Sequence, residues 1–416
     1  MAYNKLQQEA IDCTDEKILV TACPGSGKTH TMVGAIAKYK QENPKDRVVA
    51  ITFTRKAAAE LNLKLYEYPD VESATIHSWS LKELKKLGGK YNFEVSLLQD
   101  EQVTEILKMI CRRLGYWSMN YFMLFAYVMG NYNIDVNQGT KMKNEKILRN
   151  YIVYKRENQL YDFTDLPLYL YDMLNLYNER ITNIDALYVD EFQDVDKTQA
   201  QIFEMVDTKR KFYVGDAWQS IYIFRGADES VLDDLEGFTH LTLNTNYRSY
   251  QSILDFATAA REHESVETMM GIPEESWIKA ARTQEKGQVY LIDSNEECWN
   301  FSGGVGEAVY SNSMSVMRNF MQYKPYILCR SNKQVKEIKA LGYNNVSTVH
   351  QAKGLEYPYV VVTHFDTPCL EEVNIMYVAC TRAQNGLVVT DYKFLHEFLK
   401  EGEVNFKDTM LFGEDD

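Results

Sequence analysis

The sequence has no paired-cysteine motif, no long apolar run and no excess of basic residues. Its seven cysteines include no C-x-x-C pair, which argues against a zinc or disulfide framework and predicts free thiols in a reducing compartment. No apolar stretch reaches the roughly 18 residues that span a bilayer, and the N-terminus lacks the apolar run of a signal peptide. We therefore expect a cytoplasmic protein with no membrane partner.

Positive charge is also scarce, since 45 Lys and Arg stand against 59 Asp and Glu, a net charge of −14. That balance argues against a protein that coats nucleic acid by bulk charge, but it allows a local basic groove. Apolar residues make up 45% and charged residues 25%, which is typical of globular proteins and not of disordered ones. The 416 residues predict two to four domains.

Short apolar, β-branched runs recur along the chain with helical stretches between them. Runs that are apolar on both faces suit parallel strands buried beneath helices, and alternation with helices indicates an α/β fold. The runs form two groups, before and after about residue 245, which predicts two α/β units. They are residues 18–20, 48–51, 187–189, 212–214, 326–328, 360–362 and 387–389.

Residues 81–154 have a different pattern. Val103, Ile106, Leu107 and Ile110 have helical spacing, and eleven Lys and Arg stand against seven Asp and Glu. This predicts a helical insertion with a relatively basic surface. For any single lysine, an ordinary solvated helical face explains the charge equally well.

A phosphate-binding loop follows the first apolar run. Residues 22–29 read ACPGSGKT, a P-loop with Ala22 in place of the first glycine. Glycines let main-chain N–H groups approach phosphate oxygens, and the next helix adds the dipole of its N-terminus. Lys28 is expected to reach the β- and γ-phosphates and Thr29 to ligate Mg²⁺. The residues expected to bind ATP here are Ala22, Pro24, Gly25, Ser26, Gly27, Lys28, Thr29 and His30.

Two adjacent acids, Asp190 and Glu191, end the third apolar run. Asp190 is expected to hold Mg²⁺, and Glu191 to orient and deprotonate the attacking water. Exposed pairs of acids are usually only solvated. Directly after a buried strand, the catalytic interpretation is favoured.

Seven further blocks, taken in order with these two, resemble the UvrD/Rep/PcrA type of superfamily 1A DNA helicase. The resemblance implies two RecA-like, parallel-sheet ATPase domains and a helical insertion. It divides the chain into domain 1A (1–80 and 155–245), insertion 1B (81–154) and domain 2A (246–416). A segment at 162–166 would return the chain from the insertion. The seven blocks are residues 4–10 (NKLQQEA), 52–58 (TFTRKAA), 75–79 (TIHSW), 214–227 (VGDAWQSIYIFRGA), 244–249 (NTNYRS), 347–356 (STVHQAKGLE) and 377–383 (YVACTRA).

The resemblance also implies the remaining contacts to the nucleotide. Gln7 would read the adenine edge, Tyr247 would stack on the adenine, and Glu356 would bind the ribose. The γ-phosphate would be contacted by Gln219, Arg248 and Arg382, with Arg382 as the arginine finger. Such an arginine is worth about 10³–10⁵ in rate in other nucleotide hydrolases.

A second set of residues would contact single-stranded DNA or its junction with duplex. Stacking of bases on aromatic rings is independent of sequence, although core packing is the alternative for these rings. His350 is alternatively a structural residue, and Trp79 and Ile76 fit the core as well as they fit DNA. Arg55 stands where the family commonly has Asn, and Phe224 where it often has Trp. The set is Phe53, Thr54, Arg55, His77, Tyr222, Phe224, Thr348 and His350.

The family usually carries a second insertion, 2B, where this sequence has only residues 343–346, so we expect 2B to be absent. The resemblance implies ATP-driven movement along DNA, 3′→5′. Without 2B, unwinding by the chain alone is one alternative, and unwinding only with a partner protein or as an oligomer is another. A nucleotide-dependent binding module and RNA as the track also remain open.

Overall fold

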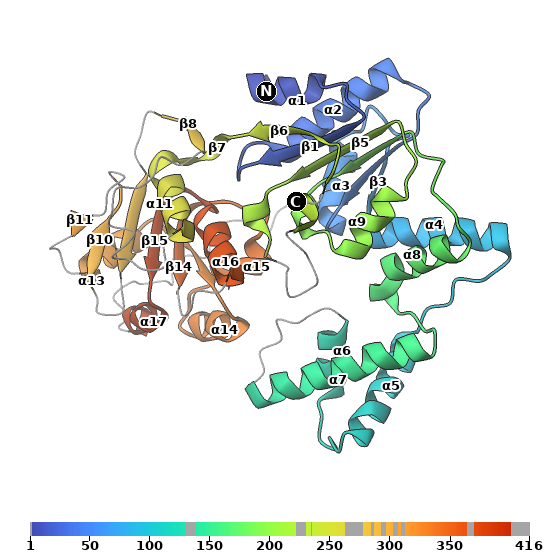
Figure 1. Cartoon of the computed structure of the whole chain (residues 1–416). Helices are drawn as coiled ribbons and strands as arrows, with labels where there is room; N and C mark the ends of the chain where they lie inside the picture. The colour runs from blue at the N-terminus through green and yellow to red at the C-terminus, as the bar shows by residue number, and fades with distance from the viewer. Residues whose placement is uncertain are drawn as a thin grey trace. The chain divides into compact units, whose positions relative to one another are not determined.

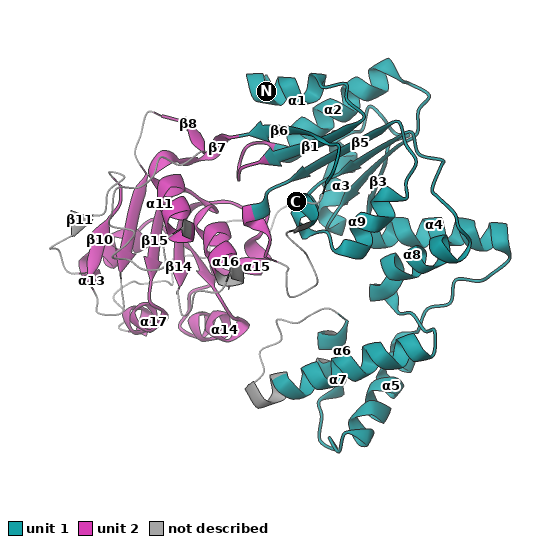
Figure 2. Ribbon diagram, viewed as in Figure 1, with its two compact units in different colours: residues 1–21, 28–217, 222–243 teal, residues 22–27, 218–221, 244–416 magenta. Residues whose placement is uncertain are grey.

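The computed structural model describes most of the chain, and its described part forms two compact units (Figure 2). Unit 1 contains residues 1–21, 28–217 and 222–243, and unit 2 contains residues 22–27, 218–221 and 244–416. The division into 1A, 1B and 2A stays a prediction. The described residues are 2–129, 138–221, 230–233, 235–262, 278–283, 287–292, 297–302, 307–308, 313–363 and 370–400.

Unit 1 is built on a six-stranded sheet of order β3-β2-β4-β5-β1-β6 (Figure 1). The pairs from β3 through to β1 are parallel. Every residue of β2 and β4 is buried, as expected for parallel strands covered on both faces. The strands are β1 (Lys17–Ala22), β2 (Val48–Thr52), β3 (Glu72–Thr75), β4 (Ala186–Val189), β5 (Arg210–Gly215) and β6 (Thr239–Leu243).

Helices cover this sheet, and side-chain caps fix where several of them start. Asn4 caps α1, Thr54 caps α3 and Thr75 caps α4, each accepting a main-chain N–H of the first turn. Helices α4, α8 and α9 pack together, and α1 packs on α2. The helices are α1 (Lys5–Asp12), α2 (Lys28–Glu42), α3 (Arg55–Lys64), α4 (Ile76–Tyr91), α8 (Leu166–Leu176), α9 (Lys197–Glu204) and α10 (Ser230–Asp233).

The region expected to be a helical insertion, residues 81–154, begins within α4, whose Leu84 and Leu87 belong to the core of unit 1. Its later part forms α5 (Asp100–Arg113), α6 (Tyr121–Val128) and most of α7 (Gln138–Glu157), around an apolar cluster of its own. Helix α7 is tied to the returning chain by the buried carboxylate of Asp162. This carboxylate accepts hydrogen bonds from Tyr151 and Lys155 at 2.8 and 2.7 Å. These two bonds hold α7 to the segment at 162–166.

Unit 2 is built on a seven-stranded sheet of order β11-β10-β9-β15-β14-β12-β13. Its pairs from β9 to β13 are parallel, whereas β10 and β11 are added antiparallel beyond β9, with β11 at the edge. The strands are β9 (Gln288–Ile292), β10 (Cys298–Asn300), β11 (Glu307–Ala308), β12 (Tyr326–Cys329), β13 (Val346–Thr348), β14 (Tyr357–Thr363) and β15 (Ala383–Thr390).

A separate two-stranded parallel pair and six helices complete the described part of unit 2. Helix α11 packs on α16 and on the pair. The elements are β7 (Thr245–Tyr250), β8 (Lys279–Arg282), α11 (Gln251–Glu262), α13 (Ser313–Met321), α14 (Asn332–Ala340), α15 (Val349–Ala352), α16 (Leu370–Cys380) and α17 (Tyr392–Lys400).

Several expectations can be compared directly with this fold. All seven apolar runs lie in strands, which confirms the α/β fold with parallel sheets. Only residues 341–345 connect α14 to β13, and Gly342 takes a left-handed φ of 92° there. The six cysteines among the described residues are free thiols. No helix in the described part of the chain is long and apolar enough to cross a membrane.

Candidate functional site

The carboxyl end of β4 brings four predicted residues of unit 1 together. The Thr29 hydroxyl donates to the Asp190 carboxylate at 2.8 Å, and the Lys28 ammonium lies 3.6 Å from the Glu191 carboxylate. Asp190 is only 6% exposed. Residues 161 positions apart in the sequence are thus in direct contact, because parallel strands end at the same edge of a sheet.

The electrostatics of Asp190 fit a divalent cation. Burial, together with the neighbouring charge of Glu191, raises the pKa of Asp190 to about 6, although Thr29 and Lys28 act in the opposite direction. A cation at this carboxylate would offset both effects. A hydroxyl and a carboxylate oxygen are ligands that Mg²⁺ prefers, so Thr29 and Asp190 suit the metal predicted for them.

Glu191 adopts an uncommon backbone conformation, and a neighbouring side chain binds its carboxylate. Its φ is +54°, in the left-handed region that non-glycine residues rarely adopt. Gln193 donates to the Glu191 carboxylate at 2.6 Å and accepts the main-chain N–H of Asp216 at 2.9 Å. Because one amide satisfies both bonds, it links the end of β4 to the end of β5. The sequence alone assigned no role to Gln193.

Residues 22–27 of the P-loop belong to unit 2 and pack on the start of β7. Gly25 and Gly27 have φ of +64° and +81°, which glycine adopts without strain. The Asn246 amide donates to the Pro24 carbonyl at 2.5 Å, and the Tyr247 N–H donates to the Gly25 carbonyl at 2.9 Å. A Cβ at Gly25 would lie 2.7 Å from the Arg248 Cβ, so this position has no room for a side chain.

Asn246 is a further residue that the sequence did not single out. It is fully buried, and its Oδ1 also accepts the N–H groups of Arg248 and Ser249 at 2.8 and 2.7 Å. One side chain therefore fixes both the P-loop and the backbone of Arg248. Only the three-dimensional proximity of residues 24 and 246 reveals this role.

Arg248 and Glu356, predicted to bind different parts of the nucleotide, bind each other. The Arg248 Nε donates to Glu356 at 2.6 Å, and its Nη1 donates to the Thr381 carbonyl at 3.1 Å. Gln384 donates to the other Glu356 oxygen at 2.9 Å. The Tyr247 ring, expected to stack on adenine, is 46% exposed.

The structure also places Arg382 beside Gln219, within unit 2. The Arg382 side chain is 1% exposed and donates to the carbonyls of Val378 and Leu355 at 2.9 and 3.2 Å. Its Nη2 lies 3.4 Å from the Gln219 Oε1. Two residues expected at the γ-phosphate are thus held together by the surrounding main chain.

Gln7 and His30, the other expected nucleotide contacts, lie in the helices of unit 1. The buried Gln7 side chain forms a capping box with Asn4, whose N–H it accepts at 2.9 Å. The His30 ring stacks on Tyr3 with 4.5 Å between ring centroids, and burial lowers its pKa.

The residues expected to contact DNA differ in their exposure. Thr54 and Arg55 are exposed at the start of α3, and Phe53 is half-buried. The ring of His77 is half-buried and stacks on Phe163, with 5.6 Å between centroids. Trp79 and Ile76 are 0% and 4% exposed and belong to the core.

Two others are buried and bonded to the protein itself. Thr348 is 3% exposed and caps α15. His350 is 8% exposed, with Nε2 3.2 Å from the Ile221 carbonyl. Tyr222 and Phe224 lie outside the described residues. A DNA contact stays a prediction for all eight residues.

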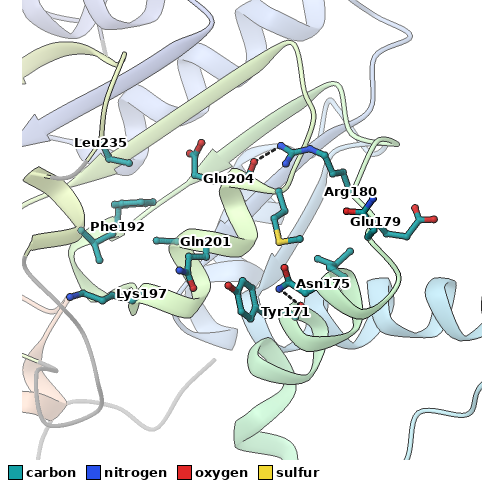
Figure 3. A pocket seen from close by; sticks show the side chains of 14 residues that line it. Tyr171, Asn175, Glu179, Arg180, Phe192, Lys197, Gln201, Glu204 and Leu235 are labelled. Carbon is teal, nitrogen blue, oxygen red and sulfur yellow. Dashed lines mark hydrogen bonds between the residues drawn. The ribbon is translucent and has the colours of Figure 1, made fainter.

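A cavity of about 610 Å³ lies elsewhere on unit 1 (Figure 3). Its lining comes from α8, α9, α10 and the turns beside them, and includes Phe192, the residue after Glu191. None of the residues predicted from the sequence to bind nucleotide or DNA lines it.

Comparisons with known proteins agree with the order of the blocks. Residues 3–240 match the family model of the UvrD/REP helicase N-terminal domain. Residues 345–390 match that of the UvrD-like helicase C-terminal domain.

Among similar curated proteins is a "Probable DNA helicase" of Mycoplasma pneumoniae, 26% identical over 92% of this chain and 82% of that protein. An "ATP-dependent DNA helicase Rep" of Buchnera aphidicola is 28% identical over 62% of this chain and 45% of its own length. An "ATP-dependent DNA helicase PcrA" of Staphylococcus epidermidis is 26% identical over 65% of this chain and 41% of its own length. The chain thus spans less than half the length of these Rep and PcrA relatives.

Proposed function

The chain belongs to the UvrD/REP helicase family, and from that premise we propose that it is an ATP-driven motor on single-stranded DNA. The observation that carries the proposal is the contact of Thr29 with Asp190 and of Lys28 with Glu191 at the end of β4. These are the groups that nucleotide hydrolysis needs: a phosphate-binding cation, metal ligands and a base for water.

Each predicted residue then has a defined task. Lys28 and the P-loop amides bind the phosphates, and Glu191 accepts the proton of the attacking water. Thr29 and Asp190 would hold Mg²⁺, which neutralises phosphate charge when bound. Gln7, His30, Tyr247 and Glu356 bind the nucleoside. The γ-phosphate is contacted by Gln219, Arg248 and Arg382.

Binding of the nucleotide requires a change at Arg248. Its guanidinium is paired with Glu356, yet the proposed roles place one residue on the γ-phosphate and the other on the ribose. ATP therefore exchanges this ion pair for two contacts to ligand. The exchange makes the conformation of β7 sensitive to whether the γ-phosphate is present.

Single-stranded DNA is the proposed track, and 3′→5′ is the proposed direction. The exposed Thr54 and Arg55 and the half-buried Phe53 offer a hydroxyl, a cation and a ring beside one another. Since a local groove supplies the affinity, binding should weaken as salt rises despite the net charge of −14.

The test is ATP hydrolysis with and without single-stranded DNA. We expect several-fold stimulation by DNA and loss of hydrolysis in Lys28→Ala. An unstimulated chain, or a Lys28→Ala variant with full activity, would contradict the motor. RNA oligomers that compete with DNA at equal concentration would show that RNA is also a track.

A second candidate is a translocase that unwinds duplex only with a partner protein or as an oligomer. The short connection between α14 and β13 favours it, because the sequence places no 2B domain there. A forked-duplex assay over a range of protein concentrations separates the two. Unwinding that rises more steeply than the concentration of protein supports the oligomer.

A further inference from the structure

Three consecutive main-chain carbonyls, those of residues 219–221, are each bound by a side chain from another part of unit 2. Lys353 donates to the Gln219 carbonyl at 2.9 Å, and Asn374 donates to the Ser220 carbonyl at 3.0 Å. The His350 Nε2 lies 3.2 Å from the Ile221 carbonyl. Because a carbonyl oxygen only accepts, this His350 nitrogen must carry the hydrogen.

These carbonyls are in a place where water does not satisfy them. Gln219 is 4% exposed, and Ser220 and Ile221 are fully buried. A buried carbonyl without a donor is destabilising, and residues 220 and 221 lie in neither a helix nor a strand. The donors on α15, on the turn after α15 and on α16 therefore help to keep the segment in position.

The side chains of the same segment are also held within unit 2. The Trp218 ring has the Arg261 guanidinium 4.3 Å above its centre and the Tyr377 ring edge-on at 5.3 Å. The Gln219 amide oxygen lies 3.4 Å from Arg382. Residues 218–221, which come shortly after β5 of unit 1 in the sequence, thus contact unit 2 and belong to it.

We propose that Lys353, Asn374 and His350 are positioning residues that clamp the main chain of residues 219–221 to unit 2. The clamp makes the segment move with unit 2 as the state of the nucleotide changes. The residues on either side of it in the chain belong to unit 1, so movement of unit 2 passes along the main chain into unit 1. This inference rests on the proposed function, since it concerns how hydrolysis is coupled to DNA.

Asn374 provides the sharpest test. Asn374→Leu keeps the volume of the side chain and removes the donor to Ser220. A matched control is Asn144→Leu, since Asn144 is also a helical asparagine, is 2% exposed and lies in α7. Lys353→Met removes the donor to the Gln219 carbonyl at a position that is less buried than Asn374. Lys353→Arg keeps a donor there and should behave like wild type.

Variants of the 416-residue chain are compared in DNA-free ATP hydrolysis, in DNA-stimulated hydrolysis and in the ATP that they consume per nucleotide travelled. Melting temperature and affinity for single-stranded DNA are measured alongside. For Asn374→Leu and Lys353→Met we expect DNA-free hydrolysis and DNA affinity within about twofold of wild type. Stimulation by DNA should fall at least fivefold, while Asn144→Leu and Lys353→Arg should resemble wild type.

Each outcome decides a separate point. A wild-type chain without DNA stimulation refutes the proposed function and this inference with it. A stimulated wild type with equally stimulated Asn374→Leu and Lys353→Met refutes the clamp alone. Equal losses of DNA-free and DNA-stimulated hydrolysis also refute the clamp, because they indicate a purely structural role for these residues.

Discussion

Replacement of Gln193 by leucine should uncouple the position of Glu191 from the rest of unit 1. The change removes the 2.6 Å bond to the Glu191 carboxylate and the 2.9 Å bond from the Asp216 N–H at a site that is 1% exposed. A hydrogen bond to a charged group contributes about 1.5–3 kcal/mol. The left-handed backbone of Glu191 costs on the order of 1–3 kcal/mol, so the lost bond is comparable to the strain that it offsets.

The expected result is a slower chemical step. Without the bond from Gln193, the Glu191 carboxylate is no longer held in place in the transition state. We expect kcat to fall by about 10–100-fold, because each 1.4 kcal/mol or so of lost transition-state stabilisation lowers the rate tenfold. KM for ATP should change little, since Gln193 is not a proposed contact of the nucleotide. Unfolding by denaturant should show about 1–3 kcal/mol lower stability from the unpaired Asp216 N–H.

The matched control for this prediction is Gln199→Leu. Gln199 is also a buried glutamine, but its side chain only caps α9. Its loss should lower stability by about 1 kcal/mol and leave kcat unchanged. A folded Gln193→Leu protein with kcat within twofold of wild type would show that Gln193 does not position Glu191 for the chemical step.

Three further predictions follow from the same geometry. Gly25→Ala should weaken nucleotide binding at least tenfold, because a Cβ there meets Arg248 at 2.7 Å, whereas Gly89→Ala in α4, with open space, should leave binding unchanged. Asn246→Ala should lower the free energy of unfolding by about 2–5 kcal/mol, since two main-chain N–H groups lose their acceptor; denaturation that matches wild type would contradict this. Burial lowers the pKa of His77 in the folded chain below the ordinary value of 6.5, so His77 binds a proton more readily in the unfolded chain. The free energy of unfolding should therefore fall as pH drops from 7.5 to 5.5, and it should fall less in His77→Phe.

The sequence predicted the strands that are buried on both faces and missed others. Residues 48–51 and 187–189 form β2 and β4 because apolar side chains on both faces are buried by neighbouring elements. Strand β3 has no such signal, since all four of its residues are only half-buried. Strands β10 and β11 are three and two residues long, too short for a pattern.

The candidate site was predictable where its chemistry is local. The P-loop and the acids at 190–191 are contiguous motifs, and the structure adds that they are in contact. Gln193, Asn246 and Asn374 act through partners 23, 222 and 154 positions away, so only the fold reveals them.

The burial of Arg382 is a feature that the sequence does not predict. Arg382 is among the largest fully buried side chains described, although arginines are usually exposed. It is held by main-chain carbonyls, which satisfy its donors without a surface position. Residue type alone does not predict such an arrangement.

ATP-driven movement along single-stranded DNA is measured most directly by displacement of streptavidin from biotinylated oligonucleotides. The chain and its Lys28→Ala variant are each tested with biotin at the 5′ end or at the 3′ end, with ATP and Mg²⁺. We predict ATP-dependent displacement from the 5′ end, where a 3′→5′ motor arrives, and none by Lys28→Ala. Displacement from neither end, or displacement that continues without ATP, would show that the chain is not an ATP-driven motor on DNA.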